Sequence, residues 1–148
     1  MRGSKLCRQG NGVLALIAAL AMATEGCGPS GPFPMVQVTG TATYDDGSPI
    51  PGDRVTVTFV PQTKPVDAKT HPRSGFAVLD ETTGAFDVCT TSRYGDGLIR
   101  GKHKVFIVSV DENESQLPVV PRSYTDPRNT PLEIDTADSP LKIEIPRP

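Results

Sequence analysis

Proline is the residue type that most constrains the fold of this chain. All 15 prolines in the 148 residues follow Cys27, the chain also holds 14 glycines, tryptophan is absent, and aromatic residues make up only 5%. Proline fixes φ and removes a backbone donor, so it ends helices and is excluded from the middle of a sheet. The composition after Cys27 therefore predicts one domain of short strands joined by stiff turns, without helices.

Two stretches of alternating apolar and polar residues form the starting point of the predicted sheet. Residues 54–61 place Val55 and Phe59 on one face, and residues 36–44 alternate in the same way. Such a period of two is typical of a half-buried strand. The connecting residues 45–53 contain two glycines and two prolines, which reverse a chain easily. We therefore expect the two strands to pair as a hairpin.

Five further runs have the length and pattern of strands. They are residues 75–80, 85–90, 102–110, 132–135 and 141–145. Seven short strands with long turns predict an all-β, antiparallel sandwich of two sheets with a Greek-key order. Phe59 and Phe86 are expected in its one core, whereas residues 102–110 are apolar on both faces, so their inward face stays open.

The amino terminus has the pattern of an export signal. Three basic residues precede an apolar run from Val13 to Ala23. Eleven residues of helix rise only about 16 Å, roughly half the hydrocarbon thickness of a bilayer, so a spanning helix is not expected. We therefore interpret residues 1–26 as a signal peptide.

Two cleavage sites follow the apolar run. Residues 24–27, Thr-Glu-Gly-Cys, resemble a bacterial lipobox, with Thr24 where leucine is usual and Glu25 where a small residue is usual. Cleavage there would leave Cys27 as a lipidated amino terminus, with residues 27–35 as anchor and Gly/Pro tether, and residues 36–148 as the domain. The alternative is cleavage after Ala23 and a soluble exported protein.

Cysteine usage distinguishes these alternatives. With Cys7 removed and Cys27 lipidated, Cys89 has no partner and is expected to be buried in a strand. The soluble alternative predicts a Cys27–Cys89 disulfide. The three cysteines and two histidines have no metal-ligand spacing, so no metal is expected.

The distribution of charge argues against nucleic acid as a partner and predicts that the two ends of the domain differ in charge. Removal of residues 1–26 leaves 12 basic and 16 acidic residues, and no basic patch is interleaved with aromatic residues, so nucleic acid is not an expected partner. If successive strands reverse, loops 62–75, 91–101 and 136–140 share the end where the tether enters, with five basic and three acidic residues. Loops 45–53, 80–84 and 111–131 share the far end, with nine acidic and two basic residues.

Several runs of the chain resemble one known family. The runs are 38–41 (VTGT), 47–52 (GSPIPG), 84–86 (GAF), 101–105 (GKHKV) and 121–127 (PRSYTDP). They resemble the carboxypeptidase-regulatory-like, or transthyretin-like, domains of short bacterial lipoproteins. The resemblance implies a prealbumin-like Greek-key sandwich in which Ile50 plugs one end and His103 occupies a position that is more often aromatic.

The residues with catalytic potential point to no catalytic centre. His71 lies beside Pro72 in a loop, and His103 lies between two lysines in a strand. Neither belongs to a nucleophile motif, and the carboxy-terminal Tyr-Arg-Gly-Ser of the transthyretin-like hydrolases is absent. Residues 111–115 resemble the start of a calcium loop, but the glycine that such a loop requires is replaced by Gln116. We therefore expect a protein that is not an enzyme and has no cofactor.

The sequence therefore predicts a binding or structural module of the cell envelope, anchored to a membrane through Cys27 and facing the periplasm or exterior. Its expected partner is an envelope protein or a polysaccharide, bound at the acidic far end. The candidate residues there are Asp45, Asp46, Asp53, Glu81, Asp111, Glu112 and Glu114. The alternative is a soluble secreted carbohydrate-binding or hydrolase-associated domain, which an exposed Tyr94 beside a second aromatic residue would favour.

Overall fold

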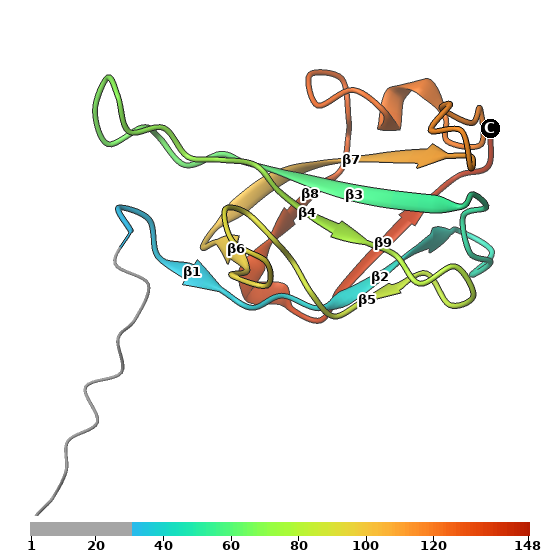
Figure 1. Ribbon diagram of the computed structural model, residues 1–148, viewed down its shortest axis with the longest axis horizontal. Coiled ribbons are helices and arrows are strands. Elements are labelled where there is room, and N and C mark those ends of the chain that lie inside the picture. Colours follow the sequence, from blue (N-terminus) through green and yellow to red (C-terminus); the bar gives the residue numbers. More distant parts are fainter. Residues whose placement is uncertain (1–30) are drawn as a thin grey trace, which may run out of the picture.

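The computed structural model describes residues 31–148, which form nine short strands and two single-turn 3₁₀ helices (Figure 1). The two 3₁₀ helices are η1 (Arg122–Tyr124) and η2 (Thr136–Asp138), and the described residues contain no α-helix. The all-β prediction is therefore confirmed. The expected signal peptide and the lipidation of Cys27 lie outside the described residues.

Most of the strands form two sheets. One contains β5 (Ala85–Phe86), β2 (Gly40–Tyr44) and β9 (Leu141–Ile145), in that order. The other contains β4 (Gly75–Val78), β3 (Arg54–Pro61), β7 (Lys102–Val110) and β8 (Glu133–Asp135). A further short ladder joins β1 (Met35–Val36) to β6 (Leu98–Ile99).

The inner faces of the two sheets form one hydrophobic core. Val55, Val57 and Phe59 of β3 are buried as the alternation predicted, and Phe59 meets Phe86 of the opposite sheet at a ring-centroid distance of 5.9 Å. The common core of Phe59 and Phe86 is thus confirmed. In β7 the buried residues are Val105 and Ile107, which decides the face that the sequence left open.

The predicted hairpin between residues 36–44 and 54–61 is wrong. β2 pairs with β5 and β9, whereas β3 pairs with β4 and β7 in the other sheet. Each of the two strands has one apolar face, and both faces are buried when the strands oppose each other across the core instead of lying side by side. Ile50, in the connection between them, is also buried and belongs to the same core.

Several strand boundaries differ from the prediction. Residues 36–44 divide into β1 and β2 because Val36 pairs with Leu98, whereas Gly40 pairs with Phe86 and Leu141. A side chain at Gly40 would collide with Leu141 and Phe86, so glycine permits this close approach. The predicted strand 85–90 shortens to β5, Thr90 bridges to Phe76 of the other sheet, and β6 lies in a predicted loop.

The strands are also not all antiparallel to their neighbours. β2 and β9 pair in parallel from Gly40–Leu141 to Tyr44–Ile145, and the other strand pairs are antiparallel. Among the seven strands of the two main sheets, which exclude β1 and β6, β2 and β9 are the first and the last of an alternating series, so both run in the same direction. The sheet β5-β2-β9 is therefore mixed.

The long segment 111–131 does not stay at the far end. Residues 111–116 form a tight turn, in which Asp111 N–H donates to Ser115 O at 3.0 Å. The chain then returns along the flank of the sandwich: Tyr44 Oη donates to Val119 O at 2.6 Å, and Thr130 Oγ1 donates to Val105 O at 2.6 Å. Arg122, Asp126 and Arg128, which the loop count assigned to the far end, lie in this returning part.

Candidate functional site

The acidic residues predicted as a binding surface lie on three loops beyond the ends of the core strands. Asp45 N–H donates to Ile145 O at 2.9 Å, and Asp53 N–H donates to Val110 O at 3.0 Å. Loop 45–53 therefore begins beside the end of β9 and ends beside the end of β7, where loop 111–116 starts. Loop 79–84 joins them through Gly84 O, which accepts a hydrogen bond from Ala42 N–H at 2.8 Å. We call these three loops the far end; they carry eight acidic and no basic residues.

Asp46 is the most strongly held carboxylate of the far end. It accepts hydrogen bonds from the Ser48 hydroxyl, from Ser48 N–H at 2.9 Å and from Arg147 Nε at 3.0 Å. These three donors lower the pKa of Asp46 to about 2. Arg147 also lies over the Tyr44 ring, with Cζ 4.4 Å from the centroid. Asp46 therefore fastens residues 145–148 to loop 45–53.

The other far-end carboxylates fall into two groups. Three of them are engaged by neighbours. Glu114 pairs with Arg54 at 3.1 Å, Asp111 accepts the N–H groups of Asn113 and Ser115 at 2.9 Å each, and Asp80 accepts those of Thr82 at 3.1 Å and Thr83 at 2.8 Å. For the second group, no hydrogen bond or ion pair of the side chain is found within residues 31–148; this group is Asp45, Asp53, Glu81 and Glu112. The structure thus confines the available charge to the second group, whose side chains are all exposed.

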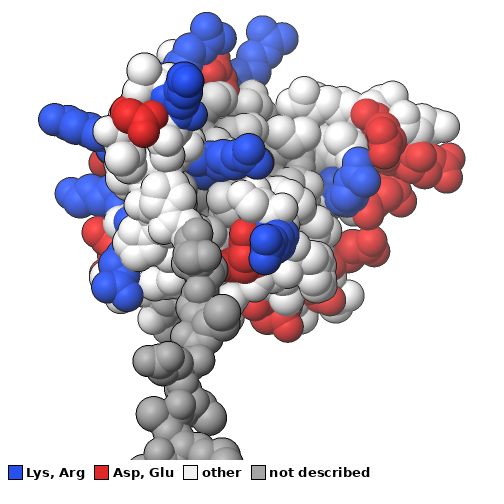
Figure 2. Space-filling model, turned by 60° about the vertical axis from the view of Figure 1, so that its left-hand side comes forward, with Lys and Arg blue, Asp and Glu red and all other residues white. Residues whose placement is uncertain are grey.

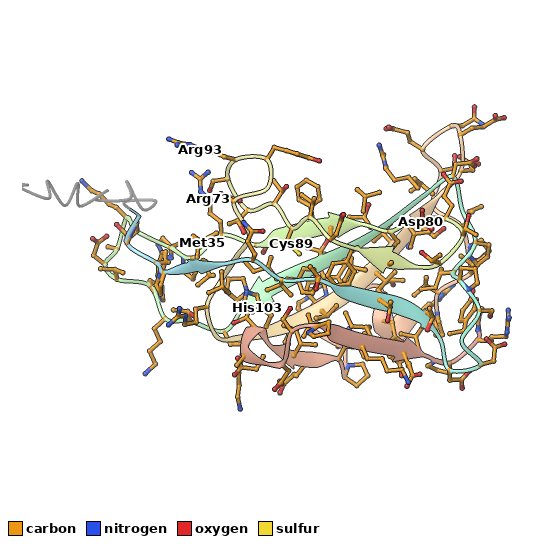
Figure 3. All side chains as sticks on the ribbon, turned by 90° about the horizontal axis from the view of Figure 1, so that it is seen from below. Met35, Arg73, Asp80, Cys89, Arg93 and His103 are labelled. Carbon is orange, nitrogen blue, oxygen red and sulfur yellow. The ribbon has the colours of Figure 1, made fainter. Side chains whose placement is uncertain are left out.

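The opposite end of the sandwich contains an open hollow of about 690 Å³. Its polar lining includes Lys69, Arg73 and Arg93, and its apolar lining includes Phe33 and Met35. Figure 3 shows Arg73 and Arg93 projecting from neighbouring loops on the side of Met35. Figure 2 shows blue basic side chains over the left and centre of this face with single red acidic ones among them, and a larger group of red side chains on the right. We call this hollow and loops 62–74 and 91–97 the tether end.

Two aspartates shape the loops that carry these cations. Asp67 accepts the N–H groups of Lys69 and Thr70 at 2.7 Å each, and these bonds lower its pKa. Asp96 accepts N–H groups from Thr91 at 2.7 Å and from Arg93 at 2.9 Å. Burial raises the pKa of Asp96, but these backbone donors outweigh it and the pKa falls. Both carboxylates are therefore committed to their own loops.

The cations of the tether end are available for an external anion. The ion pairs found within residues 31–148 involve Arg54, Arg128, Lys142 and Arg147, and none of these lines the hollow. Arginine guanidinium groups bind phosphate and carboxylate oxygens in a bidentate manner. The sequence had assigned these charges to the tether end, but no sequence signal indicated that they line a hollow.

The chain reaches the domain at the edge of this hollow. Phe33 is buried, and Pro34 O accepts a hydrogen bond from Arg100 N–H at 2.8 Å. Met35 begins β1, which pairs with β6. Residues 33–35, expected in the tether, therefore pack onto the domain, and Phe33 and Met35 line the hollow together with its basic residues.

Two side chains of reactive types, a thiol and an imidazole, are buried in the interior of the domain. Cys89 is a free, fully buried thiol that donates to Val38 O at 3.3 Å, and burial raises its pKa to about 11. His103 is 1% exposed, lies edge-on to Phe59 at 6.4 Å, and has Nδ1 3.0 Å from Gly101 O. Burial lowers the pKa of His103, so the ring is neutral near pH 7. Neither side chain is exposed at the molecular surface.

Three further observations concern function. Tyr94 is 88% exposed, and the aromatic contacts found within residues 31–148 are Phe59–Phe86 and Phe59–His103, so the described chain shows no paired aromatic platform at Tyr94. No group of three His, Cys, Asp or Glu side chains in the described residues is placed to hold a metal ion. The described residues also contain no helix of the length and apolarity that crossing a membrane requires.

Comparisons with family models, with curated proteins and with solved structures find no match for this chain.

Proposed function

We propose that this protein is an exported module that is anchored through a lipid on Cys27, has no catalytic activity, and carries a transthyretin-like Greek-key sandwich. Its tether end faces an anionic membrane surface, and its far end is presented to an envelope protein or a polysaccharide. The observation that carries the proposal is that residues 31–33 and Met35 line the same hollow as three cations, Lys69, Arg73 and Arg93.

The connectivity supports the Greek-key part of the proposal. The chain passes from one sheet to the other between β2 and β3, between β4 and β5, between β5 and β7, and between β8 and β9. Such repeated crossing between two packed sheets is characteristic of Greek-key sandwiches. The burial of Ile50 and of His103 against Phe59 agrees with the positions that the family resemblance implies.

The covalent length of the chain supports the membrane orientation. Five residues separate Cys27 from Phe33, which is packed on the domain. A chain of this length spans at most about 20 Å. This limit exceeds the roughly 8 Å screening length of physiological salt, so the position of the tether sets which end of the domain faces the membrane. Attraction between Arg73, Arg93 and anionic headgroups adds to this orientation when the tether is not fully extended.

The anchor is tested by mass spectrometry of the mature protein from its native envelope. A lipid-modified amino terminus at Cys27 is the expected result. A mature chain that starts at Thr24 with an unmodified Cys27 would refute the anchor and favour the soluble alternative.

The orientation is tested with fluorophores on single cysteines introduced at Val66 and at Asn113, which are exposed at the tether end and the far end. In vesicles that contain phosphatidylglycerol, we expect a lipid-surface quencher to quench the label at Val66 more strongly. Arg93→Glu should reduce the difference, whereas Arg122→Glu, the same charge change on the flank, should leave it unchanged. Equal quenching at both positions, or stronger quenching at Asn113, would contradict the orientation.

A further inference from the structure

One complete strand of the sandwich lies at an open sheet edge. β9 is the last strand of the order β5-β2-β9 and pairs within the described residues with β2 alone. Figure 3 shows the red β9 along the lower border of the molecule, outside β2. β9 has five residues, whereas β5 at the other edge of this sheet has two. In the second sheet, the edge strand β4 is partly covered, because Phe76 and Thr90 exchange two backbone hydrogen bonds of 2.8 Å.

The hydrogen bonds to β2 define which backbone groups of β9 point outward. Leu141 N–H donates to Thr39 O at 2.8 Å, and Ile145 O accepts from Asp45 N–H at 2.9 Å. Backbone groups of successive strand residues alternate in direction, so Leu141, Ile143 and Ile145 face β2. The N–H and C=O groups of Lys142 and Glu144 consequently point to the open edge.

We propose that two copies of this chain pair through β9, antiparallel and centred on Ile143. In this register Lys142 of one copy lies opposite Glu144 of the other, and Glu144 opposite Lys142. These are the residues whose backbone groups point outward, so each such pair exchanges two backbone hydrogen bonds, and opposite charges face each other. The β5-β2-β9 sheets of the two copies thereby join into one continuous sheet across a two-fold axis.

The sequence of β9 disfavours the neighbouring registers. A shift of the centre to Lys142 or to Glu144 places like charges opposite each other, which is destabilising. The same shifts place Pro140 or Pro146 where a backbone donor is required, and proline has none. A shift by one residue places Lys142 of one copy opposite Ile143 of the other, whose N–H and C=O groups already face β2, so the outward groups lose their partners. The alternation of Lys142, Glu144 and the flanking prolines therefore selects the register centred on Ile143.

The side chains are placed for this exchange. Lys142 Nζ and Glu144 Oε1 are 2.7 Å apart within one chain, and their side chains are 74% and 42% exposed. Pairing adds a second, oppositely charged neighbour to each, so four charges alternate in sign across the junction. A junction of two five-residue strands is expected to bury less surface than the roughly 1,200 Å² of stable interfaces, so we expect a dissociation constant above about 1 µM.

The pairing is independent of the proposed function. Because the strands run in opposite directions, the two tether ends lie at opposite ends of the pair. A pair of anchored copies would therefore present one basic hollow at each end and join two surfaces, or would lie along one surface. Association in solution tests the pairing without any membrane.

The test is sedimentation equilibrium of the full chain in a density-matched detergent, because all variants then share residues 1–30. The single variants Lys142→Glu and Glu144→Lys carry like charges on the edge, and each should weaken dimerisation by about tenfold or more. An equimolar mixture of the two should recover the wild-type dimer, because two Glu then face two Lys. Lys142→Pro removes an outward donor that the fold does not use, and should abolish dimerisation while the domain remains folded.

The mixture is the decisive control, since the charges within each strand stay alike and only pairing between copies restores attraction. Three results would overturn the proposal: a wild-type chain that stays monomeric at millimolar concentration, a dimer that the charge changes do not weaken, or single variants that weaken it without recovery in the mixture. Dimerisation of wild type, weakening in both single variants and recovery in the mixture would support it.

Discussion

We expect truncation of Phe59 to lower the unfolding free energy of the domain strongly. Phe59 is fully buried in β3, lies 5.9 Å from the Phe86 ring of the opposite sheet and meets His103 edge-on at 6.4 Å. Truncation of a buried phenylalanine to alanine costs about 3 to 5 kcal/mol of unfolding free energy. Aromatic pairs add about 0.5 to 1.5 kcal/mol beyond their buried area, which Phe59→Ala also loses. We therefore expect a loss of about 4 to 5 kcal/mol, a large part of the roughly 5 to 15 kcal/mol of a typical domain.

The assay is urea denaturation followed by far-ultraviolet circular dichroism. Phe76→Ala is the matched control, because Phe76 is 44% exposed on the outer face of the same sheet and should cost less than about 1 kcal/mol. A double-mutant cycle of Phe59→Leu and Phe86→Leu should show a coupling of about 0.5 to 1.5 kcal/mol. A loss below about 2 kcal/mol for Phe59→Ala, or an equal loss for Phe76→Ala, would refute the assignment of the core faces.

Three further predictions concern titratable groups. Because burial raises the pKa of Cys89 to about 11, its thiol should resist alkylation in the native protein near pH 8 and react fully in urea; rapid native labelling would contradict its burial. Burial lowers the pKa of His103 below its ordinary 6.5, so on acidification the unfolded chain binds a proton before the folded chain does. The stability that the neutral, buried ring contributes is therefore complete above about pH 6.5 and is lost as the pH falls below it. The variant His103→Phe should therefore lose less stability than wild type between about pH 7.5 and pH 5.5 in urea titrations, and equal losses would refute this role. The pKa of Asp46 is lowered to about 2, so its contribution is complete above the ordinary value of 3.8 and is lost as the pH falls through about 2; NMR titration of the carboxyl carbon should give this low value, and Arg147→Ala should raise it.

Strand positions and buried faces were largely predictable where a strand is half-buried. In β3 the apolar residues alternate strictly, so the sequence alone indicated that Val55, Val57 and Phe59 face the core, and all three are buried. In β7 both faces are apolar, and alternation gives no answer there. The inward face is that of Val105 and Ile107 because the register with β3 places them beside the buried Phe59 and Val57.

Strand pairing was not predictable from local pattern. The residues between β2 and β3 have the composition of a hairpin turn, but glycine and proline allow the chain to cross between sheets as readily as to reverse within one. Pairing depends on contacts between residues that are distant in the sequence, such as Gly40 with Leu141. The hollow at the tether end escaped prediction for the same reason, since its basic residues come from two separate loops.

The sequence by itself determined the short strands, the buried faces of the half-buried strands, and the separation of charge between two sets of loops, because these properties depend on residue spacing within a few positions. The tertiary structure alone decided which strands share a sheet, which carboxylates are engaged by neighbours such as Arg147, and that β9 remains at an open edge with Lys142 and Glu144 pointing outward. These depend on how distant segments compete for the same core and the same hydrogen bonds, and local alternation carries no information about that competition.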